Sequence, residues 1–254
     1  MTSNFRVVIP ARYESSRLPG KVLREIRGKP MLQHVWERAI DSSASEVVIA
    51  TDNERVLAAA KKFGADTCMT SEECRSGTDR VAEVCKLRNW KDTMPVVNVQ
   101  GDAPLMPTES ISRVAALLDE HSSASIATLC TPISSAADYA DEHVVKVVFD
   151  AEGRALYFSR APLPARGHDT SLESAWQSSW RHLGLYAYRM PALHELAQTP
   201  PCKMEQLERL EQLRAMWLGM EIRVGIDPHA HGPDVDTEDD LLRVAELLEE
   251  GARQ

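Results

Sequence analysis

Short apolar runs alternate with amphipathic stretches along the first 130 residues of the chain. The runs are rich in Val and Ile and predict strands at 5–9, 46–51, 95–100 and 124–129. Each amphipathic stretch begins after a proline or a small polar residue, as helices often do: Pro30, Asn53, Ser76 and Pro107. Apolar strands separated by amphipathic helices indicate an α/β fold, a mostly parallel sheet with helices on both faces.

The pattern changes after about residue 143. HVVKVVFD, RALYFSR and RHLGLYAYR follow one another as strands, and the polar stretch between the last two, 161–180, predicts a loop or arm. A helix at about 204–218, a strand at 221–226 and a helix from near Thr237 complete the chain. We therefore predict one α/β domain over 1–254 with an inserted antiparallel arm at about 143–190.

Composition narrows the class of protein. The chain has 254 residues, of which 43% are hydrophobic and 26% charged, as in an ordinary soluble globular domain. Its apolar runs fall short of the roughly 18 residues of a membrane span, so we expect a cytoplasmic protein without a membrane partner. Five scattered cysteines without a CxxC pair indicate neither a disulfide framework nor a zinc site. A net charge of -9 argues against a nucleic-acid partner.

Three cations nevertheless gather in IPARYESSRLPGK, directly after the first predicted strand: Arg12, Arg17 and Lys21. Open α/β sheets bind ligands at the carboxyl ends of their strands, and turn glycines let main-chain N–H groups face an anion. One charge pair at 4 Å is worth about 4 kcal/mol at an effective dielectric near 20, so three cations favour a triphosphate. A solvated surface turn, with charges that pair locally, is the alternative.

Familiar motifs of other enzyme classes are missing from the sequence. The first strand is not followed by GxGxxG, and Pro30 stands in GKP where a Walker loop needs Ser or Thr. HExxH and GxSxG do not occur. A dinucleotide site, a P-loop, a metalloprotease and a serine hydrolase are therefore disfavoured.

Carboxylates mark two further places. Asp102 ends the strand-like VNVQGDAP, and beside a triphosphate it would repel the ligand unless a divalent cation such as Mg²⁺ lay between them. A turn or helix-capping aspartate is the alternative. GPDVDTEDDL holds five carboxylates near a helix start, where acids favour the positive end of the helix. Most of these five need no other explanation.

Polar residues also occur in RHLGLYAYR and along the leucine-spaced EQLERLEQLRAMW. A solvated helix face explains the second set, and a structural histidine is the simpler interpretation of His182. The two histidines of DPHAH, at 227–231, lack a third partner in sequence for a metal site.

Eight segments in this order resemble the 3-deoxy-manno-octulosonate cytidylyltransferase family, from about residue 5 to 245: IPARYESSRLPGK, MTSEECRSGTDR, VNVQGDAPL, HVVKVVFD, ALYFSRAPLP, RHLGLYAYR, LERLEQLRAMW and DVDTEDDL. The resemblance implies a nucleotidyltransferase, glycosyltransferase-A-like fold and a homodimer whose arm comes from the inserted strands. It implies CMP transfer from CTP to the anomeric hydroxyl of 3-deoxy-D-manno-octulosonate, with release of pyrophosphate, for lipopolysaccharide biosynthesis.

The resemblance also implies roles for residues at matching positions. Arg12, Lys21, Asp102 and Asp236 would be catalytic, with Asp102 and Asp236 as ligands of Mg²⁺. CTP would be bound by Arg12, Arg17, Lys21, Ser76, Gly77 and Arg80. The sugar would be bound by Gln100, Arg160, His182, Tyr186, Glu211 and Gln212. No general base is assigned.

Two positions depart from the family's common pattern: Ala103 stands where relatives have Glu, and Asp234 where Gly is more usual. The additional acid, Asp234, could pair with an amine, so an 8-amino octulosonate is an alternative substrate. An N-acylneuraminate is another, although RHLGLYAYR and LEQLR favour the octulosonate. A nucleotide-sugar glycosyltransferase and a non-catalytic nucleotide-binding module are wider alternatives. The presence of both Asp102 and Asp236 argues against the module.

Overall fold

The computed structural model describes residues 4–15, 18–90, 93–229 and 231–251. Its strands form one large sheet in the order β11-β7-β10-β6-β1-β4-β5, and on this path β10 alone runs antiparallel to its neighbours. The strands are β1 (Arg6–Pro10), β4 (Glu46–Thr51), β5 (Asp66–Met69), β6 (Val96–Asn98), β7 (Ile126–Pro132), β10 (Trp180–Tyr188) and β11 (Ile222–Ile226). The predicted mostly parallel sheet is confirmed.

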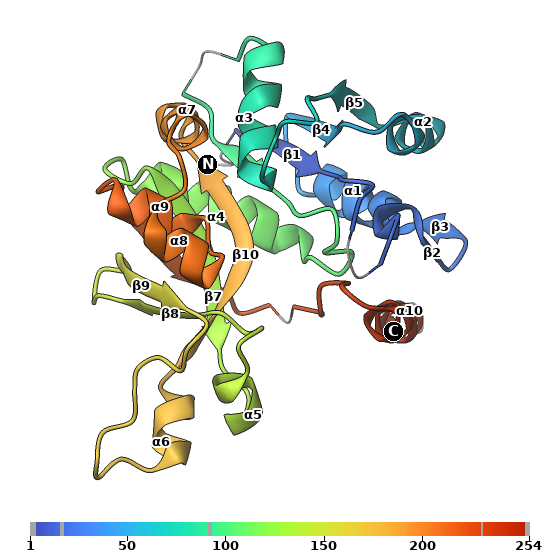
Figure 1. Cartoon of the computed structure of the whole chain (residues 1–254). Helices are drawn as coiled ribbons and strands as arrows, with labels where there is room; N and C mark the ends of the chain where they lie inside the picture. The colour runs from blue at the N-terminus through green and yellow to red at the C-terminus, as the bar shows by residue number, and fades with distance from the viewer. Residues whose placement is uncertain (1–3, 16–17, 91–92, 230, 252–254) are drawn as a thin grey trace.

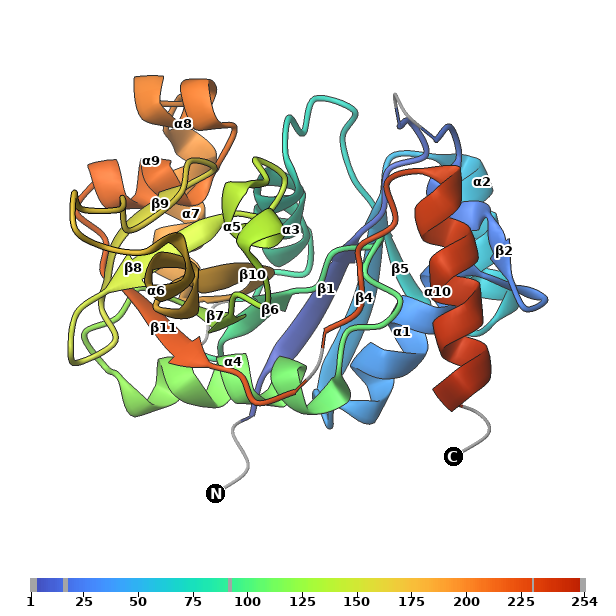
Figure 2. The ribbon, with the colours of Figure 1, turned by 90° about the horizontal axis from the view of Figure 1, so that it is seen from below.

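Helices cover both faces of this sheet (Figure 2). The helices α1 (Met31–Asp41) and α4 (Thr108–Glu120) lie on one face, and α3 (Gly77–Leu87) and α7 (Met190–Gln198) lie on the other. Two hydrophobic clusters correspond to the two faces: Val35 and Leu118 belong to one, Val84 and Leu193 to the other. The fold therefore has the three-layer form that the alternating pattern predicts.

Local sequence explains where two of these helices begin. The helix α2 (Glu54–Lys62) follows Asn53, whose side chain accepts a hydrogen bond from the Arg55 N–H at 2.9 Å. Ser76 does the same for α3 by accepting from the Asp79 N–H at 3.1 Å. Side-chain oxygens at this position satisfy N–H groups that have no partner within the helix. Short elements were not predicted, among them β5 and the ribbon of β2 (Glu25–Ile26) and β3 (Lys29–Pro30).

The inserted region projects from the body of the molecule (Figure 1). It contains the antiparallel pair β8 (Lys146–Phe149) and β9 (Ala155–Ser159), flanked by α5 (Ala136–Ala140) and α6 (Leu172–Gln177). The predicted range for this arm, about 143–190, needs correction at its end. β10 lies between β6 and β7 in the main sheet, so the projecting part ends before Trp180.

The expected helix at 204–218 is two helices. Arg209 has φ 54°, a left-handed conformation that breaks the helical path, and separates α8 (Lys203–Glu208) from α9 (Gln212–Trp217). The break makes Glu211 the residue that precedes α9. The chain then continues through β11 to α10 (Glu238–Gly251). Across the described ranges, no helix combines the length and the apolar character that a membrane crossing requires.

Candidate functional site

A cleft opens where the chain leaves β1 and β6, two parallel neighbours in the sheet. Its volume is about 390 Å³, within the range of about 300–1,000 Å³ typical of small-molecule sites. Gly101 allows the two segments to approach closely, because a Cβ there would lie 2.8 Å from the carbonyl oxygen of Pro10. The lining residues are Pro10, Arg12, Glu14, Ser15, Lys21, Val22, Gly77, Gln100, Gly101, Asp102 and Asp236.

Lys21 joins the two acids that the family resemblance singles out. It begins the short 3-10 helix η1 (Lys21–Leu23), after Gly20 in a left-handed conformation with φ 67°. Its Nζ donates to Asp102 Oδ2 at 2.6 Å and to Asp236 Oδ1 at 3.0 Å. Lys21 therefore pairs across the fold, which does not match a surface turn with local charge pairing.

Main-chain contacts explain why these distant acids meet. Val235 donates its N–H to the carbonyl oxygen of Asp102 at 2.9 Å, and its own carbonyl accepts from Lys21 Nζ at 3.0 Å. Burial opposes the charge on Lys21, but Asp102 and then Asp236 outweigh it, so the pKa of this ammonium lies above its ordinary value. Lys21 is therefore a fixed cation in the cleft at neutral pH.

The donor set of this cluster fits a magnesium ion. Both carboxylates contact the same cationic atom, Lys21 Nζ. The Asp102 side chain is still 28% exposed and the Asp236 side chain 42%. Within the described ranges, no group of three or more His, Cys, Asp or Glu side chains forms a metal site. Mg²⁺ needs no such group, because it commonly uses one or two carboxylates together with substrate phosphates and water.

The histidines of DPHAH have a structural environment. His231 Nε2 lies 2.9 Å from Asp227 Oδ2 and 3.3 Å from Ser110 Oγ, and the Asp227 carboxylate also accepts the His229 N–H. Asp227 and Ser110 are buried. This cluster fixes the segment after β11, as the sequence-based doubt about a metal site suggests.

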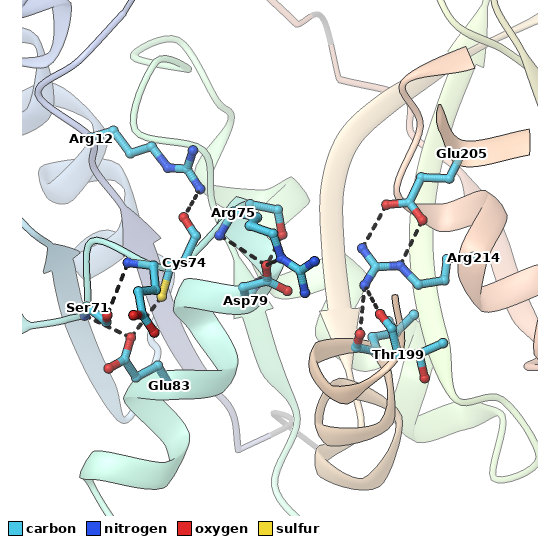
Figure 3. Close-up of polar contacts among 12 residues, drawn as sticks. Arg12, Ser71, Cys74, Arg75, Asp79, Glu83, Thr199, Glu205 and Arg214 are labelled. Atoms are coloured by element: carbon cyan, nitrogen blue, oxygen red, sulfur yellow. Dashed lines mark hydrogen bonds and ion pairs between the residues drawn. The ribbon is translucent and has the colours of Figure 1, made fainter. Parts of the chain in front are cut away.

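Arg12 is held by the turn that precedes α3 (Figure 3). Its Nη2 donates to the carbonyl oxygen of Cys74 at 2.6 Å. Glu83 holds this turn from the helix: its Oε2 accepts from the Ser71 N–H at 3.0 Å and from Cys74 Sγ at 2.8 Å. Burial and then the Glu83 carboxylate raise the pKa of the Cys74 thiol to about 12, so it stays protonated and donates.

A second carboxylate of α3 supports the same turn. Asp79 Oδ2 accepts from the Arg75 N–H at 3.2 Å, one helical turn before Glu83 (Figure 3). Sequence reasoning missed both acids, since each resembles an ordinary polar residue of an amphipathic helix. Their spacing of four residues, which places side chains on one face of a helix, was the available signal.

Three of the predicted CTP-binding residues, Ser76, Gly77 and Arg80, divide into two groups. Gly77 lines the cleft, and Ser76 lies directly before it at the start of α3. Arg80 is fully buried, and its guanidinium binds the Asp52 carboxylate and the Thr70 hydroxyl. Arg80 therefore joins the segments that directly follow β4 and β5, and it is not among the residues that line the cleft. Arg17 lies outside the described residues.

His182 and Tyr186 contact one another on β10. Their ring centroids are 5.2 Å apart, and His182 Nε2 lies 3.0 Å from Thr128 Oγ1. Burial, followed by the charge of Arg181, lowers the pKa of His182 to about 3, so its imidazole is neutral at physiological pH. Burial, together with Tyr188 and Glu211, raises the pKa of Tyr186 well above its usual value. Both rings are uncharged hydrogen-bonding groups.

Glu211 and Gln212 supply buried polar atoms that lack partners. Among the described residues, neither Glu211 Oε2 nor Gln212 Nε2 has a hydrogen-bond partner. Burial raises the pKa of Glu211, and hydrogen bonds with Thr78 and Ser76 oppose the rise. Ser76 and Glu211 are thus neighbours, which brings predicted CTP-binding and sugar-binding residues together. Unsatisfied buried groups of this kind call for a ligand or water.

Gln100 and Arg160 lie at two ends of the predicted sugar region. Gln100 lines the cleft, where a Cβ added to Gly77 would be 3.6 Å from its Oε1. Arg160 follows β9, and its guanidinium binds the main-chain oxygens of Glu208 and Glu142. Arg160 makes no hydrogen bond to Gln100, so the structure does not join these two residues directly.

Ala103 and Asp234, the two departures from the family pattern, line one small recess of about 40 Å³. His182 and Arg181 line it too, and the reasoning from sequence missed Arg181 although it adjoins His182 on the strand. Loss of water around the carboxyl group, and next the negative charge of Asp102, raise the pKa of Asp234 to about 7. Asp234 nevertheless keeps an exposed surface.

Comparisons with known proteins agree on one family. The cytidylyltransferase family model matches residues 6–222. The 3-deoxy-manno-octulosonate cytidylyltransferase of Coxiella burnetii is 48% identical over 244 residues, covering 94% of this chain and 98% of the relative. That of Thioalkalivibrio sulfidiphilus is 48% identical over 248 residues, covering 96% and 99%. A solved CMP:2-keto-3-deoxy-manno-octonic acid synthetase complexed with CTP aligns with TM-score 0.90 and 41% identity, over 98% of this chain and 100% of that one.

Proposed function

Because the chain belongs to the 3-deoxy-manno-octulosonate cytidylyltransferase family, it transfers CMP from CTP to 3-deoxy-manno-octulosonate, and we propose that the cleft around Lys21 performs this reaction. The observation that carries the proposal is the convergence of Asp102 and Asp236 on the Lys21 ammonium. A cation and two exposed acids at the carboxyl edge of the sheet suit a metal-bound triphosphate.

Within this cleft, Arg12 and Lys21 would bind the phosphate oxygens of CTP. Asp102 and Asp236 would hold Mg²⁺, which when bound supplies positive charge to the phosphates and polarises the phosphoryl group. The anomeric oxygen of the sugar would form a bond to the α-phosphorus and lose its proton to solvent, as the bond to pyrophosphate breaks. Positioning and charge neutralisation supply most of the catalysis in such a transfer. Held by the Cys74 carbonyl, Arg12 is oriented before the ligand arrives.

The sugar would lie against uncharged and unpaired groups. His182 and Tyr186 would contact its hydroxyls in their neutral forms. Glu211 Oε2 and Gln212 Nε2 offer an acceptor and a donor without internal partners in the described chain. Gln100 would contact the sugar from the cleft, and Arg160 would supply a cation for its carboxylate.

A homodimer built on the projecting arm remains a proposal, as does a cytoplasmic location. Two large apolar side chains near the arm support the dimer: Leu156 on β9 is 56% exposed and Leu207 on α8 is 84% exposed. Light scattering should give twice the chain mass, and Leu207→Glu should shift the population towards monomer. The same substitution at the exposed Leu242 of α10, which lies away from the arm, is the matched control.

A pyrophosphate-release assay tests the function directly. Each nucleoside triphosphate is paired with 3-deoxy-manno-octulosonate, its 8-amino analogue and an N-acylneuraminate, and we expect release with CTP and the octulosonate. The recess that contains Asp234 and Ala103 is the observation in favour of the 8-amino sugar. Arg181 lines the same recess and would repel an amine, so we expect the 8-hydroxy sugar to be preferred. Release only with an N-acylneuraminate would contradict the proposal.

A further inference from the structure

Lys146 is a fully buried lysine whose ammonium binds only main-chain oxygens. It lies on β8 with 0% of its surface exposed. Its Nζ donates to the carbonyls of Asp141, Val144 and Arg160 at 2.7, 2.5 and 2.7 Å. A lysine ammonium has three N–H donors and no acceptor, so this arrangement uses it completely.

Within the described part of the chain, no carboxylate forms an ion pair with this cation. Burial lowers the pKa of its ammonium, and the charge of the Asp141 carboxylate opposes this effect. A buried charge is costly unless hydrogen bonds satisfy it, and without it the carbonyls of Val144 and Arg160 would lose this donor, while that of Asp141 would keep the Val144 N–H at 3.3 Å. Lys146 therefore determines where the turn 141–144 and the main chain of Arg160 lie relative to one another.

The turn 141–144 and the end of α8 hold the Arg160 side chain. Glu208 accepts the Arg160 N–H at 2.8 Å through Oε2, and its carbonyl accepts Arg160 Nε at 2.7 Å. Arg160 Nη1 donates to the carbonyl of Glu142, inside the turn that Lys146 holds, at 2.9 Å. Within the described residues Nη2 makes no hydrogen bond, and the Arg160 side chain is only partly buried. The guanidinium is thus fixed on one side and available on the other.

We propose that Lys146 is a positioning residue for the sugar substrate, acting through Arg160. By fixing the Arg160 main chain and the Glu142 carbonyl, it keeps the guanidinium in one orientation for the carboxylate of the sugar acid. Planar guanidinium–carboxylate recognition depends on orientation, unlike attraction between point charges. This inference rests on the proposed role of Arg160 in sugar binding.

Lys146→Met tests the inference by removing the three donors while keeping an apolar side chain of similar length. We expect the KM for the sugar to rise about tenfold or more, since hydrogen bonds from a charged group are lost, while the KM for CTP changes less than about twofold. An equal rise in both KM values, or an unchanged sugar KM in folded protein, would overturn the proposal.

Arg189 offers a matched control for loss of structure. It also donates to main-chain carbonyls, those of Ala124, Leu118 and His121. It directly follows the last residue of β10, whereas the projecting arm ends before the first residue of that strand. Arg189→Met should lower the melting temperature while leaving the sugar KM unchanged. If Arg189→Met raises the sugar KM as much as Lys146→Met, Lys146 has only a structural role and the proposal is wrong.

A double variant separates this inference from the function on which it rests. If Lys146 acts through Arg160, Lys146→Met should add nothing to the sugar KM of Arg160→Ala. If the increases in sugar KM of the two single variants instead multiply in the double variant, Lys146 does not act through Arg160 and the positioning role is wrong. An unchanged sugar KM in Arg160→Ala would instead remove Arg160 from the sugar site, and the inference with it. If Lys146→Met does not fold, Lys146→Gln, which keeps two N–H donors, should show a smaller rise confined to the sugar KM, and a rise confined to CTP would contradict it.

Discussion

Two charged clusters of similar bond lengths serve different purposes in this protein. Arg214 donates to both oxygens of Glu205 at 2.8 and 2.7 Å and to the carbonyls of Leu196 and Thr199 (Figure 3). Only 4% and 9% of the Arg214 and Glu205 side chains are exposed. In the cleft, by contrast, Lys21 bridges two carboxylates of which 28% and 42% are exposed.

The difference shows how burial separates a structural ion pair from a candidate site. The Arg214 pair joins helices α8 and α9, and its donors are used inside the protein, so a ligand could not replace a partner without leaving a buried charge. The cleft carboxylates are partly exposed to solvent and share the Lys21 ammonium as a partner. A metal ion could therefore replace Lys21 at the carboxylates, and phosphate oxygens could bind Lys21, at a small cost in free energy. Bond length alone would not have distinguished them.

Asp102→Asn should have the largest effect on the cleft. It removes a proposed metal ligand without opening a cavity, so we expect turnover to fall about a thousandfold or more, with little change in melting temperature. Pyrophosphate release gives the turnover, and circular dichroism checks the fold. A folded variant that transfers CMP near the normal rate would show that Asp102 is not a ligand of the metal.

Arg214→Met should have the largest effect on the structural cluster. It leaves the Glu205 carboxylate buried without its partner, which should lower the free energy of unfolding by about 3–5 kcal/mol. Urea unfolding measures the loss. Combining it with Glu205→Gln, which removes the orphaned charge, should recover part of the stability. A loss below about 1 kcal/mol would mean that this pair stabilises the protein no more than a surface ion pair does, and its contrast with the cleft cluster would not hold.

Lys21→Ala should have a smaller effect on catalysis than Asp102→Asn. Loss of one cation should raise the KM for CTP and lower turnover, together about 10–100-fold, since hydrogen bonds between charged groups are worth about 1.5–3 kcal/mol. Arg24, three residues further on, pairs with Glu238 at the exposed surface and supplies the control. Equal responses of Lys21→Ala and Arg24→Ala to CTP would contradict the role of Lys21.

The neutral His182 predicts a gradual effect, a pH dependence of stability. Its folded pKa of about 3 lies below the 6.5 of an ordinary imidazole, so the unfolded chain binds the extra proton between these values. The stabilisation is complete above pH 6.5 and is lost as the pH falls towards 3, by at most about 1.4 kcal/mol per pH unit. Urea unfolding from pH 7 to 5 should show this slope reduced in His182→Gln, but not in a variant of the exposed His143. Identical slopes would mean that His182 is charged in the folded protein.

Local patterns predicted the framework of the fold. The alternation of strands and helices placed β4 at its observed limits and α3 at its observed start, and the cations after β1 predicted the cleft. The break at Arg209 and the central place of β10 were missed, because both depend on contacts between distant segments. Local spacing alone also could not select Asp236 among the five acids near α10. Its contact with Lys21 depends on the main chain of Val235, which binds Asp102.

Binding of Mn²⁺ in place of Mg²⁺, followed by electron paramagnetic resonance in the presence of saturating CTP, tests the central claim most directly. If Asp102 and Asp236 hold the ion together, Asp102→Asn and Asp236→Asn should each weaken its binding by about tenfold or more, to similar degrees, while Glu238→Gln leaves it unchanged. If both aspartate variants bind Mn²⁺ as tightly as the unsubstituted protein, the two acids are not a metal site.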